Sequence, residues 1–423
     1  MVEPYLPRRL ARFTEVTSGT GPADAAAWAA SGQPQRVLAD TLDPSPLVQA
    51  MIDDTRSQTT VLGEENMILG IKGGGELAVS WDTFFHGSGD TSRADADTQA
   101  TNDLIDLFEH SMGAVRRATT HTLAGGSHTA SVVNFDDVTD VAIGDWYGFV
   151  RADGLMEKRQ VLSISTLAVT LAWPLSFVPE DADLAIGLTH AYISETQLVD
   201  SAVGGTYSYL MEFGLAGSTR SYEMRGCVTH PTAIGLERGS ASTVSWETLV
   251  ASFDTPETAP TPDWSGVSAA GDAGQAIGPD TVVRFADRGA VTAGGVHAPS
   301  LAISPGLARK PIMTITEQIA GMPGLAAYGL AKGSCTMELA IVPSVDAYEI
   351  NFNARTRKTL TYERLGPVGS GFSFHFPTVE ITGTPVMSDT DESQSTQLAL
   401  KAHTDVFTSG GQARNSRMMV VFG

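Results

Sequence analysis

The sequence predicts a mainly β protein with flanking helices (α+β), built from two related β units and a small β module inserted into the first. A short motif occurs twice, as KGGGELA at 72–78 and as KGSCTMELA at 332–340. Each copy follows a strand-like run and precedes a stretch that can form a helix. Only 18% of the residues are charged, and 43 Gly and 21 Pro supply turns, which is typical of β proteins. The repeat indicates an internal duplication, which gives one subunit two similar edges; ring and tube proteins need such edges and enzymes rarely do.

Residues 1–60 are rich in Pro, Ala and Asp and have little periodicity. They predict an N-terminal arm that packs on a neighbouring subunit, or alternatively a partly disordered terminus. One short helix is expected near 47–55, because Pro46 suits a first helical turn.

The ranges 61–118 and 192–254 are predicted to form the first unit. Its clearest element is a helix capped by Asn102, in which apolar residues recur at helical spacing from Leu104 to Val115. Acidic residues near its start and arginines near its end suit the helix dipole. Strands are expected within 60–81 (two, separated by a glycine turn) and at 206–213, 221–227, 234–238 and 243–253.

The range 119–191 is predicted to be an inserted small β domain on the outside of the scaffold. Its short β runs at 130–135, 146–151, 159–165 and 167–171 are separated by Asp/Gly turns. Residues 160–179 carry no charge, but polar and apolar residues alternate and Pro174 interrupts the run. This alternation predicts a hairpin rather than a membrane-spanning helix.

The range 255–280 is predicted to be a linker, because it contains four prolines and little periodicity. The second unit is expected over 281–423, with a short helix starting at Ser344 and covering 345–353. Its strands are expected at 298–304, 312–319, 333–342, 358–363, 371–376, 377–385 and 394–404.

The chain is acidic, with 27 Lys and Arg against 48 Asp and Glu, a net charge of −21. It should therefore repel nucleic acid and anionic membranes, although ordinary solubility charge would look the same. Residues 281–423 hold 12 basic and 11 acidic residues, so the excess of −22 lies in 1–280. The two cysteines, Cys227 and Cys335, fit a reducing compartment and are expected to be small buried residues. The N-terminus has arginines but no apolar core, so a signal peptide is not expected.

A search for catalytic, cofactor and metal-binding residues predicts none of them, and the protein is not expected to be an enzyme. His121 and His128 have no ligand partners at metal-site spacing. The glycines at 73–75 lack the Lys-Ser/Thr ending of a phosphate-binding loop. Acidic pairs at 64–65 and 136–137 fit solvated turns, and serines at 127 and 370 lack a nucleophile elbow. The basic cluster Arg355, Arg357, Lys358 and Arg364 is expected to form an intersubunit salt-bridge surface.

The sequence resembles the major tail tube proteins of long-tailed, siphovirus-type phages, in their two-unit form. The phrases that carry the resemblance, over most of 55–255 and 281–423, are GGGEL at 73–77, YEMRGCV at 222–228 and FSFHFP at 372–377. The resemblance implies two tail-tube-like β-sandwich or half-barrel units with flanking helices. A small inserted β module also occurs in such proteins.

The resemblance further implies a structural virion protein whose rings stack into the hollow tail tube through which genomic DNA passes without specific binding. A homotrimeric ring of two-unit chains would imitate a sixfold ring. The expected partners are other copies of the chain and the tape measure, tail tip and tail terminator proteins, with no membrane and no cofactor. The expected location is the virion tail, assembled in the host cytoplasm. The alternative is a tail-tip or adhesin-like β-rich binding module, which exposed aromatic residues on 119–191 would favour.

Overall fold

The computed structural model describes residues 9–15, 35–37, 39–42, 77–93, 103–193, 206–215, 218–237, 240–254, 281–287, 295–296, 298, 300–319, 322–342, 357–390, 393–404 and 416–423. Strands make up 60% of the described residues and helix 4%, which confirms the mainly β prediction. The predicted helices at 47–55 and 345–353 and the predicted linker at 255–280 lie outside the described residues.

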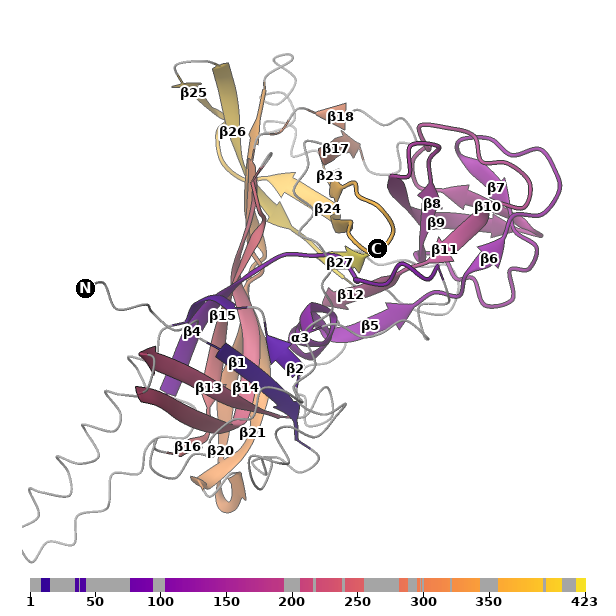
Figure 1. Cartoon of the computed structure of the whole chain (residues 1–423). Coiled ribbons are helices and arrows are strands. Elements are labelled where there is room, and N and C mark those ends of the chain that lie inside the picture. The colour runs from indigo at the N-terminus through magenta and orange to yellow at the C-terminus, as the bar shows by residue number, and fades with distance from the viewer. Residues whose placement is uncertain are drawn as a thin grey trace, which may run out of the picture.

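The first unit is a sheet in the order β2-β1-β13-β14-β15-β4-β3, and all its pairings are antiparallel. The two ends of this order, β2 and β3, follow one another in the sequence with a single residue between them (Figure 1). Its strands are β1 (Arg9–Thr14), β2 (Gln35–Val37), β3 (Ala39–Leu42), β4 (Leu77–Phe84), β13 (Tyr207–Leu215), β14 (Ser218–Glu237), β15 (Thr243–Val250) and β16 (Ser252–Asp254).

The predicted N-terminal arm is therefore wrong for 9–14, 35–37 and 39–42, which are strands of the first unit. Leu10 and Ala11 are buried, and the guanidinium of Arg12 is buried against Asp106 at 2.8 Å. The charged Arg12 hid the apolar alternation of this strand, which is why the sequence suggested an arm. Its charge can be buried because it is paired with Asp106.

The second unit has the order β18-β17-β23-β24-β26-β22-β19, again antiparallel throughout. Two further strands, β25 and β27, pair with β26 and β24. Its strands are β17 (Thr281–Asp287), β18 (Gly295–Val296), β19 (Ser300–Ser304), β22 (Thr336–Ile341), β23 (Lys358–Arg364), β24 (Phe372–Ile381), β25 (Val386–Thr390), β26 (Ser393–Ala402) and β27 (Met419–Phe422).

The two units share one topology. In chain order, β1, β2, β3, β4, β13, β14 and β15 correspond to β17, β18, β19, β22, β23, β24 and β26, and each set makes the same pairings. The two copies of the repeated motif lead into β4 and β22, which occupy the same place. A long hairpin, β20 (Leu307–Ile319) and β21 (Met322–Lys332), comes between β19 and β22. In Figure 1 it extends downward beside β14.

The predicted helix is α3 (Asp103–Met112), and its apolar face is buried against β12 (Thr189–Ile193) and β14. It ends earlier than expected, because Gly113 adopts a φ of 88° and the chain continues as strand β5 (Gly113–Arg117). Val115 therefore lies in a strand instead of on the helix face.

The inserted segment forms a small closed barrel, shown at the right of Figure 1. Six strands run in the order β6-β11-β8-β9-β10-β7, and a bridge between Leu123 and Phe135 links the two ends. The paired strands β5 and β12 (Thr189–Ile193) connect the barrel to the first unit. The barrel strands are β6 (His121–Thr122), β7 (Val132–Asn134), β8 (Trp146–Val150), β9 (Met156–Ser165), β10 (Ala168–Leu171) and β11 (Leu184–Gly187).

The barrel has an apolar core of its own, whereas the two units share one continuous core. Among the described residues, no helix combines the length and the apolar character needed to cross a membrane.

Candidate assembly interface

The two units meet strand to strand. The end of β14 pairs with β19, with Ile234 opposite Ile303 and Leu236 opposite Leu301. Because β14 also pairs with β15 and β19 also pairs with β22, one unbroken ladder runs β4-β15-β14-β19-β22-β26. The junction is therefore part of a continuous sheet rather than a flexible connection.

This continuous sheet has one dry and one wet face. One dry row crosses the junction through Val244, Ile234, Ile303, Met337 and Leu400, all of which are buried. Alternate positions are exposed or half-buried and are mostly small and polar, which is the pattern of a sheet with one solvated side. The wet positions include Ser80, Asp82, Thr243, Ser245, Glu247, Glu237, Ser300, Ala302, Ser304, Thr336, Glu338, Gln397, Ala399 and Lys401.

The wet face carries more acid than base. The wet positions named above include four acidic residues, Asp82, Glu237, Glu247 and Glu338, and one basic residue, Lys401. Such a surface repels a polyanion, and its small side chains offer few groups to bind one.

Phe85 packs between the two units on the dry side of the sheet. It follows β4 of the first unit, and its ring centroid lies 4.3 Å from Phe372, 5.1 Å from Phe374 and 5.7 Å from Phe422, all of the second unit. Its side chain is 1% exposed. The helix residue Phe108 packs on its other side at 5.7 Å.

Arg364 adds a polar contact across the junction. It lies at the end of β23 and is fully buried. Its Nη1 donates to the carbonyl oxygen of Glu237 at 3.0 Å and its Nη2 to that of Ser240 at 3.1 Å. Both acceptors belong to the hairpin between β14 and β15, so the second unit holds the hairpin of the first.

The internal junction has two counterparts that are open among the described residues. Strand β24 corresponds to β14, and β25 continues β24 after a break at 382–385, so that β25 corresponds to the end of β14. In the described part of the chain β25 pairs only with β26. Likewise β3 corresponds to β19, but its only described partner is β4. One chain therefore presents the two halves of a second junction at its two ends.

No protein-family model matches the chain, and no curated protein matches it. Its topology and its surfaces are therefore the basis for a functional proposal.

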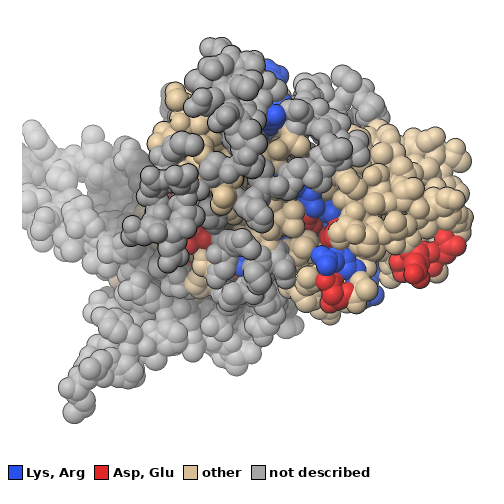
Figure 2. Space-filling model, turned by 90° about the horizontal axis from the view of Figure 1, so that it is seen from above, with Lys and Arg blue, Asp and Glu red and all other residues tan. Residues whose placement is uncertain are grey.

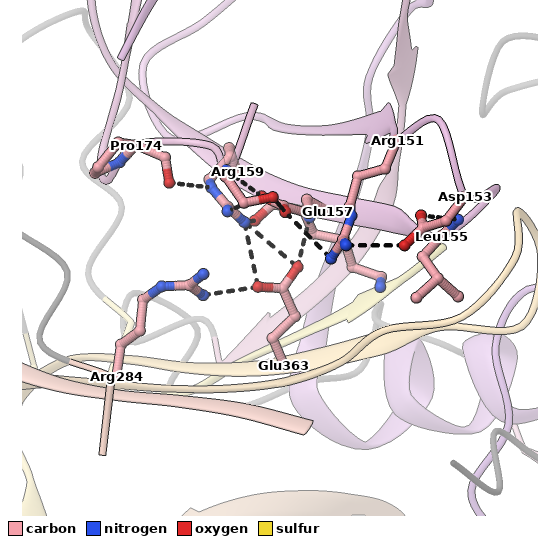
Figure 3. Close-up of polar contacts among 10 residues, drawn as sticks. Arg151, Asp153, Leu155, Glu157, Arg159, Pro174, Arg284 and Glu363 are labelled. Atoms are coloured by element: carbon pink, nitrogen blue, oxygen red, sulfur yellow. Dashed lines mark hydrogen bonds and ion pairs between the residues drawn. The ribbon is translucent and has the colours of Figure 1, made fainter. Parts of the chain in front are cut away.

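A second contact region joins the barrel to the second unit through buried charges (Figure 3). The carboxylate of Glu363 on β23 accepts hydrogen bonds from Arg284 Nη1 at 2.7 Å and from Arg159 Nη1 at 3.2 Å. It also accepts one from the Lys158 backbone N–H at 2.6 Å, and Lys158 Nζ donates to the Arg364 carbonyl at 3.1 Å. Glu157 pairs with Arg159 on the barrel side.

Apolar contacts surround these charges. Trp146 and Trp173 of the barrel pack against His375 of β24, at centroid distances of 5.3 Å and 5.7 Å. Burial lowers the pKa of His375 to about 3, so this imidazole is neutral at pH 7 and acts as a flat packing surface.

The pKa values of Glu363 and Lys158 are both lowered, which favours the charged form of Glu363 and the neutral form of Lys158. Burial alone would raise the pKa of Glu363, but Arg159, Arg284 and Lys158 together lower it to about 2. Burial lowers the pKa of Lys158 to about 8, although Glu363 opposes that shift. The site therefore stabilises the charged form of Glu363 and destabilises the charged form of Lys158.

The stability contributed by Lys158 should increase at alkaline pH. Between pH 8 and 10.5 the unfolded chain retains a proton that the folded chain has lost, so the free energy of unfolding rises with pH. We expect wild type to gain about 2–3 kcal/mol relative to Lys158→Met across this window. Urea denaturation of both proteins at pH 7.5 and pH 10 measures this, and an unchanged difference would contradict the assignment.

The residues considered in the chemical search lie apart from one another. Within the barrel, His121 lies 3.5 Å from Asp136 and His128 lies 3.1 Å from Asp181. Among the described residues, no three His, Cys, Asp or Glu side chains are grouped to hold a metal. Arg364 was expected in a basic surface cluster, but it is buried at the junction within one chain, so that expectation is wrong for this residue.

The sequence search missed Phe85, Glu363, Arg159 and Arg284. The only available signal was the adjacent charges at 157–159 and 363–364, inside otherwise strand-like runs. Three consecutive charged residues in a strand place charge on both faces, and the inward charge then needs a partner.

The barrel also has a pocket of about 510 Å³, between the end of β8 and the 177–184 segment. Phe149 and Ile186 line it together with Arg93, Arg151, Glu180 and Asp183. The large apolar residues exposed on the described barrel surface are aliphatic, namely Leu162, Leu167, Val178 and Leu184. Figure 2 shows acidic side chains at the outer end of the barrel. The exposed aromatic cluster that would favour an adhesin-like module does not occur among these residues.

Proposed function

We propose that the protein is a structural virion subunit whose copies join side by side into closed rings, and that the rings stack into the hollow tail tube of a long-tailed phage. The observation that carries the proposal is the pair of open edges, β25 and β3, which repeat the two halves of the internal β14–β19 junction. Repeating the same junction between chains would pair both of these edges. Strand addition between identical copies is then heterologous and closes when the rotation per unit divides a full turn.

The wet face would form the wall of the lumen. It runs along the same six strands as the internal ladder, so joining copies through β25 and β3 extends it without interruption. An acidic wall of small polar residues suits the passage of DNA without retention. Tape measure, tail tip and tail terminator proteins would be the further partners, with assembly in the host cytoplasm.

Cysteine cross-linking tests the edge pairing. We expect Ser388→Cys in β25, combined in turn with cysteine at positions 39–42 of β3, to give disulfide-linked oligomers that end at a trimer on a non-reducing gel. A defined largest species is expected because a closed ring has no free end. Electron microscopy of the same samples should show rings or stacked tubes.

Gly235→Cys with Ala302→Cys is the matched control, because these residues are register partners in the internal junction. Their disulfide lies within one chain and should leave the monomer band unchanged in mass. Monomers alone from every β25–β3 pair would contradict the proposed edge pairing. A ladder without a largest species would indicate open filaments instead of rings.

A further inference from the structure

The barrel is inserted into the sequence of the first unit, but it also contacts the second unit. It leaves the first unit through β5 and returns through β12. However, β12 pairs with β27 of the second unit, with Ala191 opposite Val420. The barrel residue Met156 donates its backbone N–H to the Gly366 carbonyl at 2.9 Å.

The centre of the contact between the barrel and the second unit is buried. Lys158, Arg159 and Glu363 have 0% exposure, and Trp146 and Met156 of the barrel share one buried apolar cluster with Val421 of the second unit. Figure 3 shows Glu363 pointing from the second unit toward Arg159 of the barrel, with Arg284 beside it. Apolar packing sets the distance between the barrel and the second unit, and the oriented hydrogen bonds of the charged groups set their relative direction.

Side chains of the barrel lie directly against glycine backbone of the second unit. A Cβ at Gly423 would lie 2.5 Å from Met156 Cε and 2.7 Å from Lys158 Cε. A Cβ at Gly371 would lie 2.4 Å from Lys158 Nζ and 3.0 Å from the Arg364 carbonyl oxygen. The barrel is therefore seated directly on the second-unit backbone.

A strand ladder alone does not define an angle well enough for a ring. The twist between neighbouring strands varies over a range of about 25°. Rings of five, six and seven units need rotations of about 72°, 60° and 51° per unit, which differ by only about 9–12°. A second contact, placed away from the ladder, would restrict that rotation.

We infer that the inserted barrel is a strut that spans the junction and fixes the angle between the two units. It makes the second contact through β12–β27 pairing and the Glu363 site, on the side of the sheet that carries α3. Its consequence for ring size depends on the proposed function, but the fixed angle within one chain does not.

Distance measurements between spin labels test the strut. Labels at Ser80→Cys and Ala399→Cys report on the two units, because both positions are exposed and the natural Cys227 and Cys335 are fully buried. Wild type, diluted with unlabelled chain, should give one narrow distance distribution. Gly423→Leu, which wedges the barrel away, should broaden that distribution at least twofold.

Gly371→Leu is a second wedge from a different position and should broaden the distribution as well. Gly125→Leu is the control, because it lies at the far side of the barrel, where the nearest atom to its Cβ is 3.7 Å away. Circular dichroism identifies variants that remain folded. An unchanged distribution in folded wedge variants would overturn the strut, and so would unfolding of the whole chain by both wedges, since the barrel would then be a folding element.

Electron microscopy of the same variants separates the two proposals. If wild type forms rings of one size, the wedge variants should form mixed rings and open arcs. If wild type forms no rings while the wedges still broaden the distance distribution, the strut holds and the proposed function fails.

Discussion

Replacing Glu363 with glutamine is expected to lower the free energy of unfolding by about 3–5 kcal/mol at pH 7. Glu363 is 0% exposed and is the shared acceptor for Arg159 and Arg284. Glutamine has nearly the same shape, but it removes the carboxylate that Arg159 and Arg284 share, so that Glu157, which pairs with Arg159, is left to balance two guanidiniums and the Lys158 ammonium. The loss therefore comes from uncompensated charge rather than from a cavity. Urea denaturation of the two proteins measures it.

Glu380→Gln is the matched control, because Glu380 is a β24 carboxylate that pairs with His403 at 3.0 Å and is 24% exposed. A partly solvated pair of this kind should contribute about 0–1 kcal/mol. Adding Arg284→Met to Glu363→Gln should recover part of the loss, since it removes one of the uncompensated charges. A loss of less than about 1 kcal/mol for Glu363→Gln would contradict the burial of the network.

The effect should disappear in acid. The pKa of Glu363 is lowered to about 2, whereas the unfolded carboxyl titrates near its ordinary value of 4.5. The stability that Glu363 contributes is therefore fully present above pH 4.5 and decreases as the pH falls toward 2. Wild type and Glu363→Gln should approach the same stability between pH 4.5 and pH 2.

The parts of the fold that depend on local pattern could be predicted from the sequence. The barrel strands β8, β9 and β10 were expected within a few residues of their bounds, because alternation and Asp/Gly turns identify short hairpins. Helix α3 was expected for a similar reason, since its apolar spacing and cap are both local signals.

Two long strands were each predicted as two shorter ones. Strand β14 was expected as two strands, at 221–227 and 234–238, but it is continuous over 20 residues. Its pairing register shifts between Pro231 and Ala233, so the strand continues past the proline with a bulge next to it. Strand β24 likewise continues through Pro377, where one strand at 371–376 and another at 377–385 were expected.

The junction and the charged site could not be predicted, because their partners are far apart in sequence. Arg159 and Glu363 are separated by 204 residues, and Lys158 and Arg364 by 206. Charged residues in strands usually face solvent, so composition alone assigns them to the surface. Only the folded topology, which places β9 beside β23, shows that they are buried together.

Replacing Phe85 with alanine is expected to cost about 3–5 kcal/mol and to separate the unfolding of the two units. Phe85 extends from the first unit into a cluster with Phe372, Phe374 and Phe422 of the second, so its removal leaves a cavity between the units. A cavity placed there weakens their mutual contact more than either unit alone. All six tryptophans lie in 1–280, including Trp81 and Trp246 of the first unit and Trp146 and Trp173 of the barrel. Fluorescence therefore reports on the first unit and the barrel, while circular dichroism reports on the whole chain.

The neighbouring residue provides the control. Phe84 is half-buried and lies on the wet face of β4, so Phe84→Ala should cost about 1 kcal/mol or less and leave one common transition. Phe85→Leu should fall between the two alanine variants, since leucine fills part of the cavity. Fluorescence and circular dichroism should coincide for wild type and diverge for Phe85→Ala. If they coincide for Phe85→Ala as well, the shared aromatic cluster does not couple the two units, and their joint behaviour must come from the strand ladder and the barrel alone.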